Sequence, residues 1–242
     1  MLLKIENPNL LLKAVEIISE LVVEVKFKVN DSGMSLIAID PANVAMVRFN
    51  LLKNAFSQFE NSKEEILGVN LDNLKRILKR CKSHSSLILR RDENKLSIEI
   101  QDKIKRSFTL NLIEIENEDK EMPNLEFSSK VEMNSLDLID AIEDCSVVAD
   151  ACSFIINEGN FIIEAKNLNS AKSEFSGDEA KIEAENCKAR YSLEYLQKFI
   201  KGSKLCEKTI LNFAEDHPLK MDLRIENMEI NFILAPRVET ED

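Results

Sequence analysis

The chain has 242 residues, 44% of them hydrophobic, and a formal net charge of −11 at pH 7. This length is ample for two domains of ordinary size, and the negative balance argues against a protein that wraps nucleic acid with its whole surface. The sequence has neither a run of roughly 18–20 apolar residues nor a signal-peptide pattern, so we expect an intracellular protein with no membrane span. The five cysteines are far apart and never spaced as Cys-x-x-Cys, which favours buried thiols over zinc ligands or disulfides.

The first half predicts a strand at Ile5, a largely apolar helix over residues 9–22, and alternating strands at 25–30, 34–39 and 44–51. A strand at 66–69 precedes a second helix over 71–82, and strands follow at 87–90, 96–101 and 104–112. The second helix has five basic residues against the single acid Asp72, and its apolar residues point the other way. We expect the first helix, which is so widely apolar, to lie flat on a sheet.

A connector over residues 113–127 separates the two halves. It is acidic from Glu114 to Glu126, with Lys120 as its only base, and it contains Pro123. This composition suits an exposed segment that runs over a surface. We therefore predict an N-terminal domain at 1–112 and a C-terminal domain at 128–242.

The second half predicts the same order of elements. A strand at Val131 leads to a helix over 134–146, strands at 153–157 and 161–166, an irregular polar stretch at 167–178, strands at 180–184 and 188–191, a helix over 192–201, and strands at 210–213, 219–225 and 229–234. Residues 10–19 align with 137–146 at an offset of 127, where Phe27 also falls on Phe154 and Ala38 on Ala165. Residues 70–79 align with 192–201 at an offset of 122. Four matches in one order indicate a duplicated domain.

Three segments carry a family resemblance. The run Gly68-Val69-Asn70-Leu71 with the basic helix, the turn Ile39-Asp40-Pro41, and the ending 234–239 resemble the sliding clamps of archaea and eukaryotes, the proliferating cell nuclear antigen family, in its archaeal type. The resemblance covers essentially the whole chain. It implies an α+β fold of two similar clamp-fold domains, each with two helices packed on antiparallel sheets, that form a ring-shaped head-to-tail trimer around duplex DNA.

The same resemblance implies what the protein does. It would be a polymerase processivity factor for DNA replication and repair, without a cofactor, that tethers DNA polymerase, clamp loader, flap nuclease and ligase through short client motifs. It would work in the cytoplasm or nucleoid of an archaeon, or in the nucleus of a eukaryote.

The helix cations are the candidates for DNA contact, because sliding requires attraction to phosphates without base readout. The resemblance implies that Lys13, Arg76, Lys79 and Lys201 face the duplex, and helix periodicity independently makes Lys75, Lys82 and Lys198 available. Ordinary solvated helix faces are the alternative interpretation. The helix over 134–146 has four acids and no base, so DNA contact there is doubtful.

The acidic helix could instead serve assembly, because the two contact surfaces of a head-to-tail ring differ and can carry opposite charge. On this hypothesis Arg80, Lys82 and Arg106 face Asp140 and Asp144 of the next subunit, beside paired edge strands near residues 104–112 and 171–175. Solvated charges are again the alternative.

A client pocket needs exposed apolar groups that converge from several segments. Val44, Met46 and Ile233 are each also compatible with an ordinary core position, whereas Pro123, Leu125 and Pro236 occur in polar, irregular contexts where burial needs a partner. The positions that correspond to the pocket by resemblance are Ile39, Val44, Met46, Met122, Pro123, Leu125, Pro218, Ile233, Ala235 and Pro236.

Two other function classes stay open. One is a clamp-fold subunit of a heteromeric ring with a specialised or checkpoint role, which the oligomeric state of the isolated chain would distinguish. The other is an enzyme whose acids bind metal. Against an enzyme, the chain has only His84 and His217, neither with a nucleophile at a recognisable spacing, and its five glycines are too scattered for a phosphate-binding loop.

Overall fold

The computed structural model describes residues 1–116 and 120–238. The chain divides into two compact units. Unit 1 comprises Met1–Pro41, Val47–Met122 and Glu226–Ile230, and unit 2 comprises Ala42–Met46, Pro123–Ile225 and Asn231–Asp242. None of the helices in the described residues is long and apolar enough to cross a membrane.

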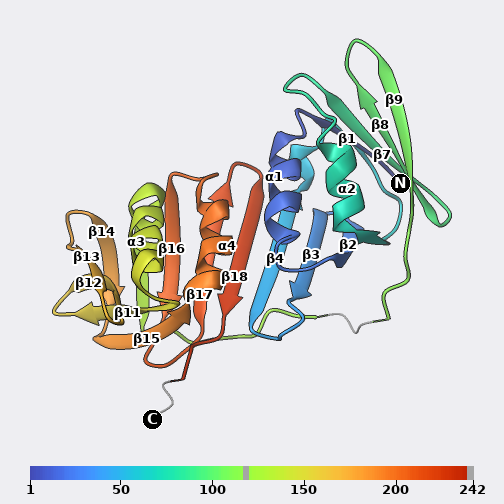
Figure 1. Ribbon diagram of the computed structural model, residues 1–242. Coiled ribbons are helices and arrows are strands. Elements are labelled where there is room, and N and C mark those ends of the chain that lie inside the picture. Colours follow the sequence, from blue (N-terminus) through green and yellow to red (C-terminus); the bar gives the residue numbers. More distant parts are fainter. Residues whose placement is uncertain (117–119, 239–242) are drawn as a thin grey trace. The chain divides into compact units, whose positions relative to one another are not determined.

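Unit 1 contains two helices and two sets of antiparallel strands, and its helices pack against each other (Figure 1). One set has the strand order β5-β1-β7-β8-β9, and in the other β4, β3, β2 and β6 are neighbours in that order. The elements are β1 (Leu2–Glu6), α1 (Asn9–Ile18), β2 (Glu24–Asn30), β3 (Gly33–Ile39), β4 (Ala45–Leu52), the short 3-10 helix η1 (Lys53–Ala55), β5 (Gln58–Glu60), β6 (Glu65–Asn70), α2 (Leu71–Leu78), β7 (Ser86–Asp92), β8 (Lys95–Gln101) and β9 (Lys105–Asn111).

Unit 2 repeats this arrangement with the strand orders β14-β10-β16-β17-β18 and β13-β12-β11-β15. Its helices also pack against each other. The elements are β10 (Ser129–Asn134), α3 (Ser135–Val148), β11 (Ala151–Asn157), β12 (Asn160–Lys166), β13 (Ser170–Phe175), β14 (Ala180–Ala184), β15 (Cys187–Ser192), α4 (Leu193–Ser203), β16 (Lys208–Phe213), β17 (Leu219–Ile225) and β18 (Met228–Leu234).

The sequence repeat therefore corresponds to a repeat of structure. β2 and β3 coincide with β11 and β12 at the offset of 127, and β6 coincides with β15 at the offset of 122. The interval between β12 and β15 is five residues shorter than that between β3 and β6, which accounts for the change of offset. The predicted fold class, two similar α+β domains with two helices each, is confirmed.

Each unit has its own apolar core. In unit 2 the ring of Phe154 makes edge contacts with Phe161, Tyr191 and Phe213 at centroid distances of 5.5, 5.3 and 5.9 Å. In unit 1 Phe27, the repeat counterpart of Phe154, makes an edge contact with Phe49 at 6.3 Å. Buried aromatic pairs in this geometry stabilise a core beyond the area that they bury.

Two of the helices, α2 and α3, begin where the sequence supplies a side-chain cap. The side chain of Asn70 accepts a hydrogen bond from the backbone N–H of Asn73 (3.1 Å), and that of Asn134 accepts one from Leu136 (2.8 Å). Such caps satisfy backbone donors that the first turn leaves unpaired. On α2 the side chains of Leu71, Leu74 and Leu78 are buried, which leaves its cations on the outer side.

Gly68 fixes the start of the connector. The backbone N–H of Ile113 donates to the carbonyl of Gly68 (2.9 Å), and a Cβ atom at position 68 would lie only 2.0 Å from the Ile113 oxygen. Only glycine allows so close an approach of two backbones. The connector therefore leaves unit 1 from a defined point on β6.

Four details differ from the sequence prediction. The helix predicted over 9–22 ends at Ile18, because the N–H groups of Glu20 and Leu21 bond three residues back and the chain then turns toward the β-branched residues before β2. The helix predicted over 71–82 ends at Leu78 with the same tightening. β5 was not predicted, and the stretch predicted as irregular contains β13, whose alternating pattern is exposed because it lies at a sheet edge.

Candidate DNA and partner surfaces

The cations of α1 and α2 share one acid. Glu16 lies 3.0 Å from the Nζ atom of Lys13 and 3.4 Å from that of Lys79. Burial raises the pKa of Glu16, but hydrogen bonds and charge from the two lysines outweigh it and the pKa is lowered. Glu16 therefore stays ionised at neutral pH and offsets part of the charge of Lys13 and Lys79. Sequence reasoning missed this link, although the spacing of Lys13 and Glu16 is a helical one.

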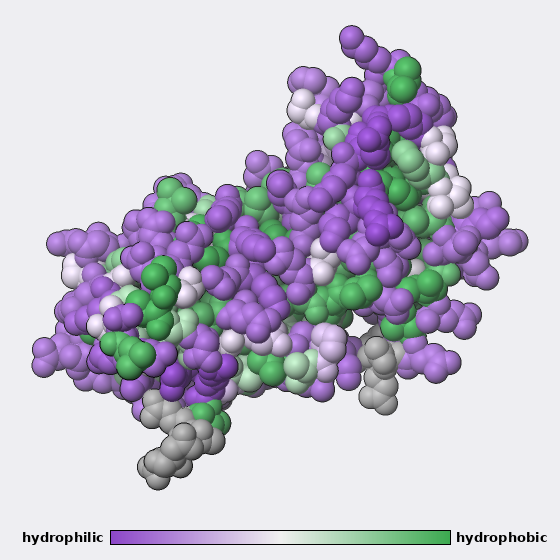
Figure 2. Space-filling model, in the orientation of Figure 1, coloured by the Kyte–Doolittle hydropathy of each residue, from purple (hydrophilic) through white to green (hydrophobic). Residues whose placement is uncertain are grey.

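Arg76 is the least compensated cation on this surface. It is exposed on α2 and forms no hydrogen bond or ion pair with the described residues. Lys75, by contrast, bonds to the Ser19 hydroxyl (3.0 Å) and pairs with Asp72 (2.8 Å), and Lys82 is exposed beyond the helix end. Hydrophilic side chains cover the visible face over α1 and α2 (Figure 2).

On α4 the two predicted DNA contacts differ in exposure. Lys198 is half-buried, pairs with Glu194 (2.8 Å) and lies over the Tyr195 ring at 4.8 Å from its centroid. Lys201 is exposed one turn further along. Of the two, Lys201 is the better placed to meet a ligand from solution.

The acids of α3 are all exposed. Leu138, Ile142 and Cys145 face the core, and the opposite side presents Asp137, Asp140, Glu143 and Asp144 to solvent. Of these acids Glu143 lies 3.8 Å from Lys204, the residue directly after α4. The outer face of α3 is therefore negative, whereas α2 and the end of α4 are positive.

Two edge strands lie beside the oppositely charged helices. In the described residues β9 ends one set of strands in unit 1, and α2 packs against it. In unit 2 β13 ends the other kind of set, β13-β12-β11-β15, and α3 packs against β12 and β13. The basic helix α2 thus packs against the edge strand β9, and the acidic helix α3 packs against the edge strand β13.

The predicted interface cations are not equally available. Arg106 pairs with Asp102 and donates to the carbonyl of Arg80 (3.0 Å), while Arg80 and Lys82 are exposed. A hydrogen bond from Ser85, opposed by burial and reinforced by Arg106, lowers the pKa of Asp102. Arg106 therefore orders the end of α2 within its own unit, a role that its position in an exposed strand did not reveal.

The predicted client residues divide between the units. In unit 1 Ile39 and Met122 are half-buried. In unit 2 Val44, Met46, Leu125, Pro218, Ala235 and Pro236 are half-buried, Pro123 is exposed, and Ile233 is buried at 8% exposure. The N–H of Ala235 donates to the Val44 carbonyl (2.9 Å), so unit 2 brings these two together.

His217, the residue before Pro218, makes contacts that the sequence did not identify. The rings of Phe127 and His217 meet edge to face at 5.6 Å, and the Tyr191 hydroxyl donates to the His217 carbonyl (2.7 Å). These contacts fix both the end of the connector and the loop before β17.

Unit 1 has a mainly apolar hollow beside Met122. It has a volume of about 280 Å³ and lies over β3 and β4, where Arg48 and Asn50 supply polar groups. Its lining is Ser35, Leu36, Ile37, Arg48, Asn50, Glu121 and Met122. Sequence reasoning found only Met122 here, although the strand alternation puts Ile37 and Arg48 on outward faces.

Each unit has two helices on antiparallel sheets, and cations lie on outward helix faces. This duplicated arrangement defines the class of two-domain clamp-fold proteins. The sequence profile of the proliferating cell nuclear antigen N-terminal domain matches residues 1–121, and that of the C-terminal domain matches residues 121–238. The chain belongs to the proliferating cell nuclear antigen family.

Known proteins agree with this assignment. The chain is 38% identical over 228 residues to the DNA polymerase sliding clamp of Thermococcus onnurineus, and 36% identical over 229 residues to that of Pyrococcus furiosus, with 91% of this chain and 92% of each relative covered. The crystal structure of Proliferating Cellular Nuclear Antigen from Entamoeba histolytica has the same fold, with a TM-score of 0.91, 24% identity and 98% of both chains covered. The predicted family and sliding-clamp class are confirmed.

Proposed function

We propose that three copies of this chain form a closed ring around duplex DNA, and that the ring holds a DNA polymerase and other replication and repair proteins on the template. The single observation that carries this proposal is the structural repeat, because it leaves β9 at an edge in unit 1 and β13 at an edge in unit 2, with helices of opposite charge beside them. The relatives named as DNA polymerase sliding clamps support the same role.

The repeat suggests how copies join. β18 is the counterpart of β9, and β4 is the counterpart of β13. In unit 1 the N–H of Leu52, on β4, donates to the carbonyl of Asn227 (2.9 Å), and in unit 2 the N–H of Ala235 donates to Val44 (2.9 Å). If the counterparts pair likewise, β9 of one copy joins β13 of the next, and a head-to-tail contact of this kind closes into a ring.

Charge favours the same contact. Pairing of β9 with β13 would bring the end of α2, with Arg80 and Lys82, toward the exposed acids Asp140 and Asp144 of α3. Arg106 would contribute chiefly by ordering the α2 end, because it is already paired with Asp102. Complementary charge adds specificity and speeds association.

The DNA contact would come from exposed cations on helices. The exposed cations are Lys13, Arg76, Lys79 and Lys201. Lys198, whose amine lies over the Tyr195 ring, would add its charge. Lysine and arginine contacts to phosphate carry no sequence information, which suits a ring that slides.

Clients would bind at the partly exposed apolar residues of unit 2 that include Val44, Met46 and Ala235. Methionines such as Met46 and Met122 adapt to several anchors, and DNA polymerase, clamp loader, flap nuclease and ligase are the client classes that we expect. We place the protein's work at the chromosome, in the cytoplasm of an archaeal cell, and expect no catalytic activity of its own.

Two measurements test the proposal. Light scattering on the purified chain should give three times the mass of one copy, whereas a subunit of a heteromeric ring would stay monomeric without its paralogues. After loading, the protein should remain on nicked circular DNA and leave once the circle is cut, because a ring that encloses DNA without binding it tightly slides off an end. Equal retention on both forms would contradict enclosure.

A further inference from the structure

A second basic site lies on the outward face of the β13-β12-β11-β15 sheet. The hollow has a volume of about 170 Å³ and is lined by Ala151, Ser153, Glu164, Ala165, Lys166, Lys188 and Arg190. Three cations face one acid there, on a chain whose net charge is −11. A local positive field on an acidic protein concentrates anions.

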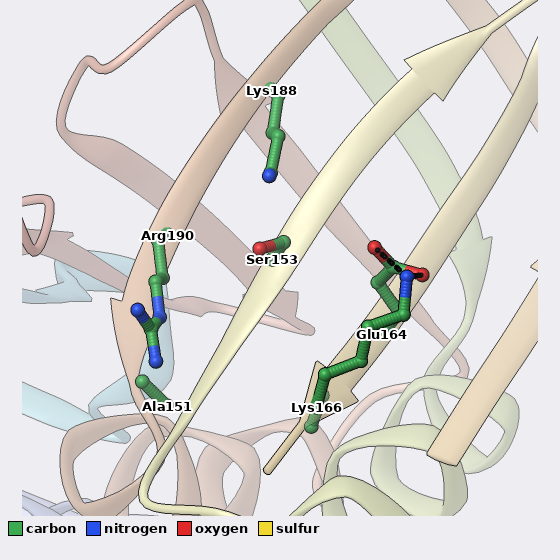
Figure 3. A pocket seen from close by; sticks show the side chains of 7 residues that line it. Ala151, Ser153, Glu164, Lys166, Lys188 and Arg190 are labelled. Carbon is green, nitrogen blue, oxygen red and sulfur yellow. Dashed lines mark hydrogen bonds and ion pairs between the residues drawn. The ribbon is translucent and has the colours of Figure 1, made fainter. Parts of the chain in front are cut away.

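The sheet register puts these side chains on one face. Ser153 of β11 lies opposite Glu164 of β12 on one side and opposite Arg190 of β15 on the other. Lys188 stands two residues before Arg190 on the same strand, so its side chain points to the same face. In Figure 3 the amine of Lys188 and the guanidinium of Arg190 lie on either side of the Ser153 hydroxyl.

The Ser153 side chain is the central observation. Its residue is only 9% exposed, and its hydroxyl has no hydrogen-bond partner among the described residues, although it points into the hollow (Figure 3). Because the hydroxyl reaches the hollow, a ligand bound there can accept its hydrogen bond. Lys188 likewise makes no ion pair through its amine with the described part of the chain. The Ser153 hydroxyl and the Lys188 amine are thus donors that have no acceptor among the described residues.

The one acid is already compensated. The carboxylate of Glu164 pairs with Lys166 at 3.1 Å, and its charge also acts on Lys172 of β13. Figure 3 shows the Lys166 amine against Glu164, on the far side of Ser153 from Arg190. The Lys188 amine, which pairs with no described acid, therefore leaves the side of the hollow away from Glu164 positive.

We propose that this hollow binds a phosphate group. A hydroxyl, a guanidinium and an ammonium converge there, and these donors together suit the several oxygens of a tetrahedral oxyanion. The phosphate belongs to a ligand other than enclosed duplex DNA. Ser153 and Cys152 are adjacent on β11, so their side chains lie on opposite faces, and the Cys152 thiol contacts that of Cys145 on α3. The site and α3 are thus on opposite faces of the sheet.

The test uses the purified full chain without DNA. Inorganic phosphate and N-acetyl-O-phosphoserine methylamide are each titrated at constant ionic strength, held with chloride, while the thermal midpoint is followed. A ligand that binds only the folded state raises the midpoint in a saturable way. Tighter binding of the phosphoserine compound would assign a phosphorylated side chain as the source, and equal binding would assign free phosphate.

Variants localise the effect. Lys188→Gln and Ser153→Ala should each weaken the apparent phosphate affinity about tenfold, because each removes a hydrogen bond to a charged group. Lys172→Gln is the matched control: it removes the same charge from the same face outside the hollow, and it should leave the affinity within about twofold. No saturable effect of phosphate, an equal loss in Lys172→Gln, or displacement of phosphate by duplex DNA would each overturn the proposal.

Discussion

Single residues decide how the connector leaves unit 1. Gly68 lies so close to Ile113 that any side chain would meet the carbonyl oxygen. The position was noticed in the sequence only as part of a family pattern, and the structure supplies the physical reason for it.

We predict that Gly68→Ala lowers the free energy of unfolding by about 1–3 kcal/mol, because the added methyl group must displace the Ile113 backbone. Denaturant unfolding measures the change. Gly177→Ala is the control, since nothing lies within 4 Å of a Cβ atom there, and it should change stability by no more than about 0.5 kcal/mol. Equal effects of the two substitutions would show that the contact with Ile113 is not strained.

Met46 gives a prediction on client binding. Met46→Asp would put a charge where an apolar anchor is desolvated, and the affinity for a client peptide should fall at least tenfold, ~1.4 kcal/mol or more. Calorimetry with a peptide from the C-terminus of a client measures it. Val147→Asp, at a side chain on α3 that is 83% exposed, is the control. Undiminished affinity in a folded Met46→Asp protein would mean that the pocket lies elsewhere.

Whole elements carry the DNA hypothesis. Arg76 and Lys79 belong to the α2 region and Lys201 to α4, and all three are exposed. On this hypothesis each such cation would add a phosphate contact and the release of a counterion.

Changing Arg76, Lys79 and Lys201 together to alanine should reduce polymerase processivity on a long primed template, whatever its sequence. The oligomeric state and client-peptide affinity should not change. A triple alanine variant at Lys63, Lys95 and Lys130, exposed residues outside the helices, loses the same charge and should keep the activity. Equal loss in both variants would point to net charge rather than to the helix faces.

The elements that the sequence predicted well have strong periodic patterns. α2 and α4 were found with their buried leucines, and β2 and β3 with their alternation, because one face of each is buried in its own unit. β13 was assigned to an irregular stretch because its residues are mostly polar and exposed, and nothing in one unit requires them to alternate. Helix ends were misjudged where hydrogen bonds shift from four to three residues back, as after Ile18.

The candidate surfaces were predictable to a different degree. Exposed helix cations such as Arg76 can be read from spacing alone. The pairing of Arg106 with Asp102 and the exposed hydroxyl donor of Ser153 could not, because both depend on strand register across a turn or a sheet. The alternation within one strand predicts which of its side chains face solvent. Which side chains contact each other across strands depends on the register, which the sequence of one strand does not contain.

The molecule as a whole is proposed to work as an assembly, and its charges provide the test. Replacing Asp140 and Asp144 with lysine should dissociate the trimer, measured as mass by light scattering, because like charges would then face each other. High salt should weaken the parent trimer too, if the ion pairs are exposed.

Charge reversal on the other side distinguishes a specific contact from general damage. A chain that combines Arg80→Glu and Lys82→Glu with Asp140→Lys and Asp144→Lys should form the trimer again. If the protein with only Asp140→Lys and Asp144→Lys stays trimeric, the ion pairs do not stabilise the interface. The edge strands would then be what holds the copies together.

The repeat preserves the backbone of the two units but not their electrostatics. α1 balances Lys13 against Glu16, whereas its counterpart α3 carries four acids and no base. The other pair of counterparts, α2 and α4, both carry cations, so only α1 and α3 differ in charge between the units. In the proposed ring of three copies a duplex would then be attracted by α2 and α4 and repelled by α3 of every copy, which would leave it guided on three sides without being held tightly.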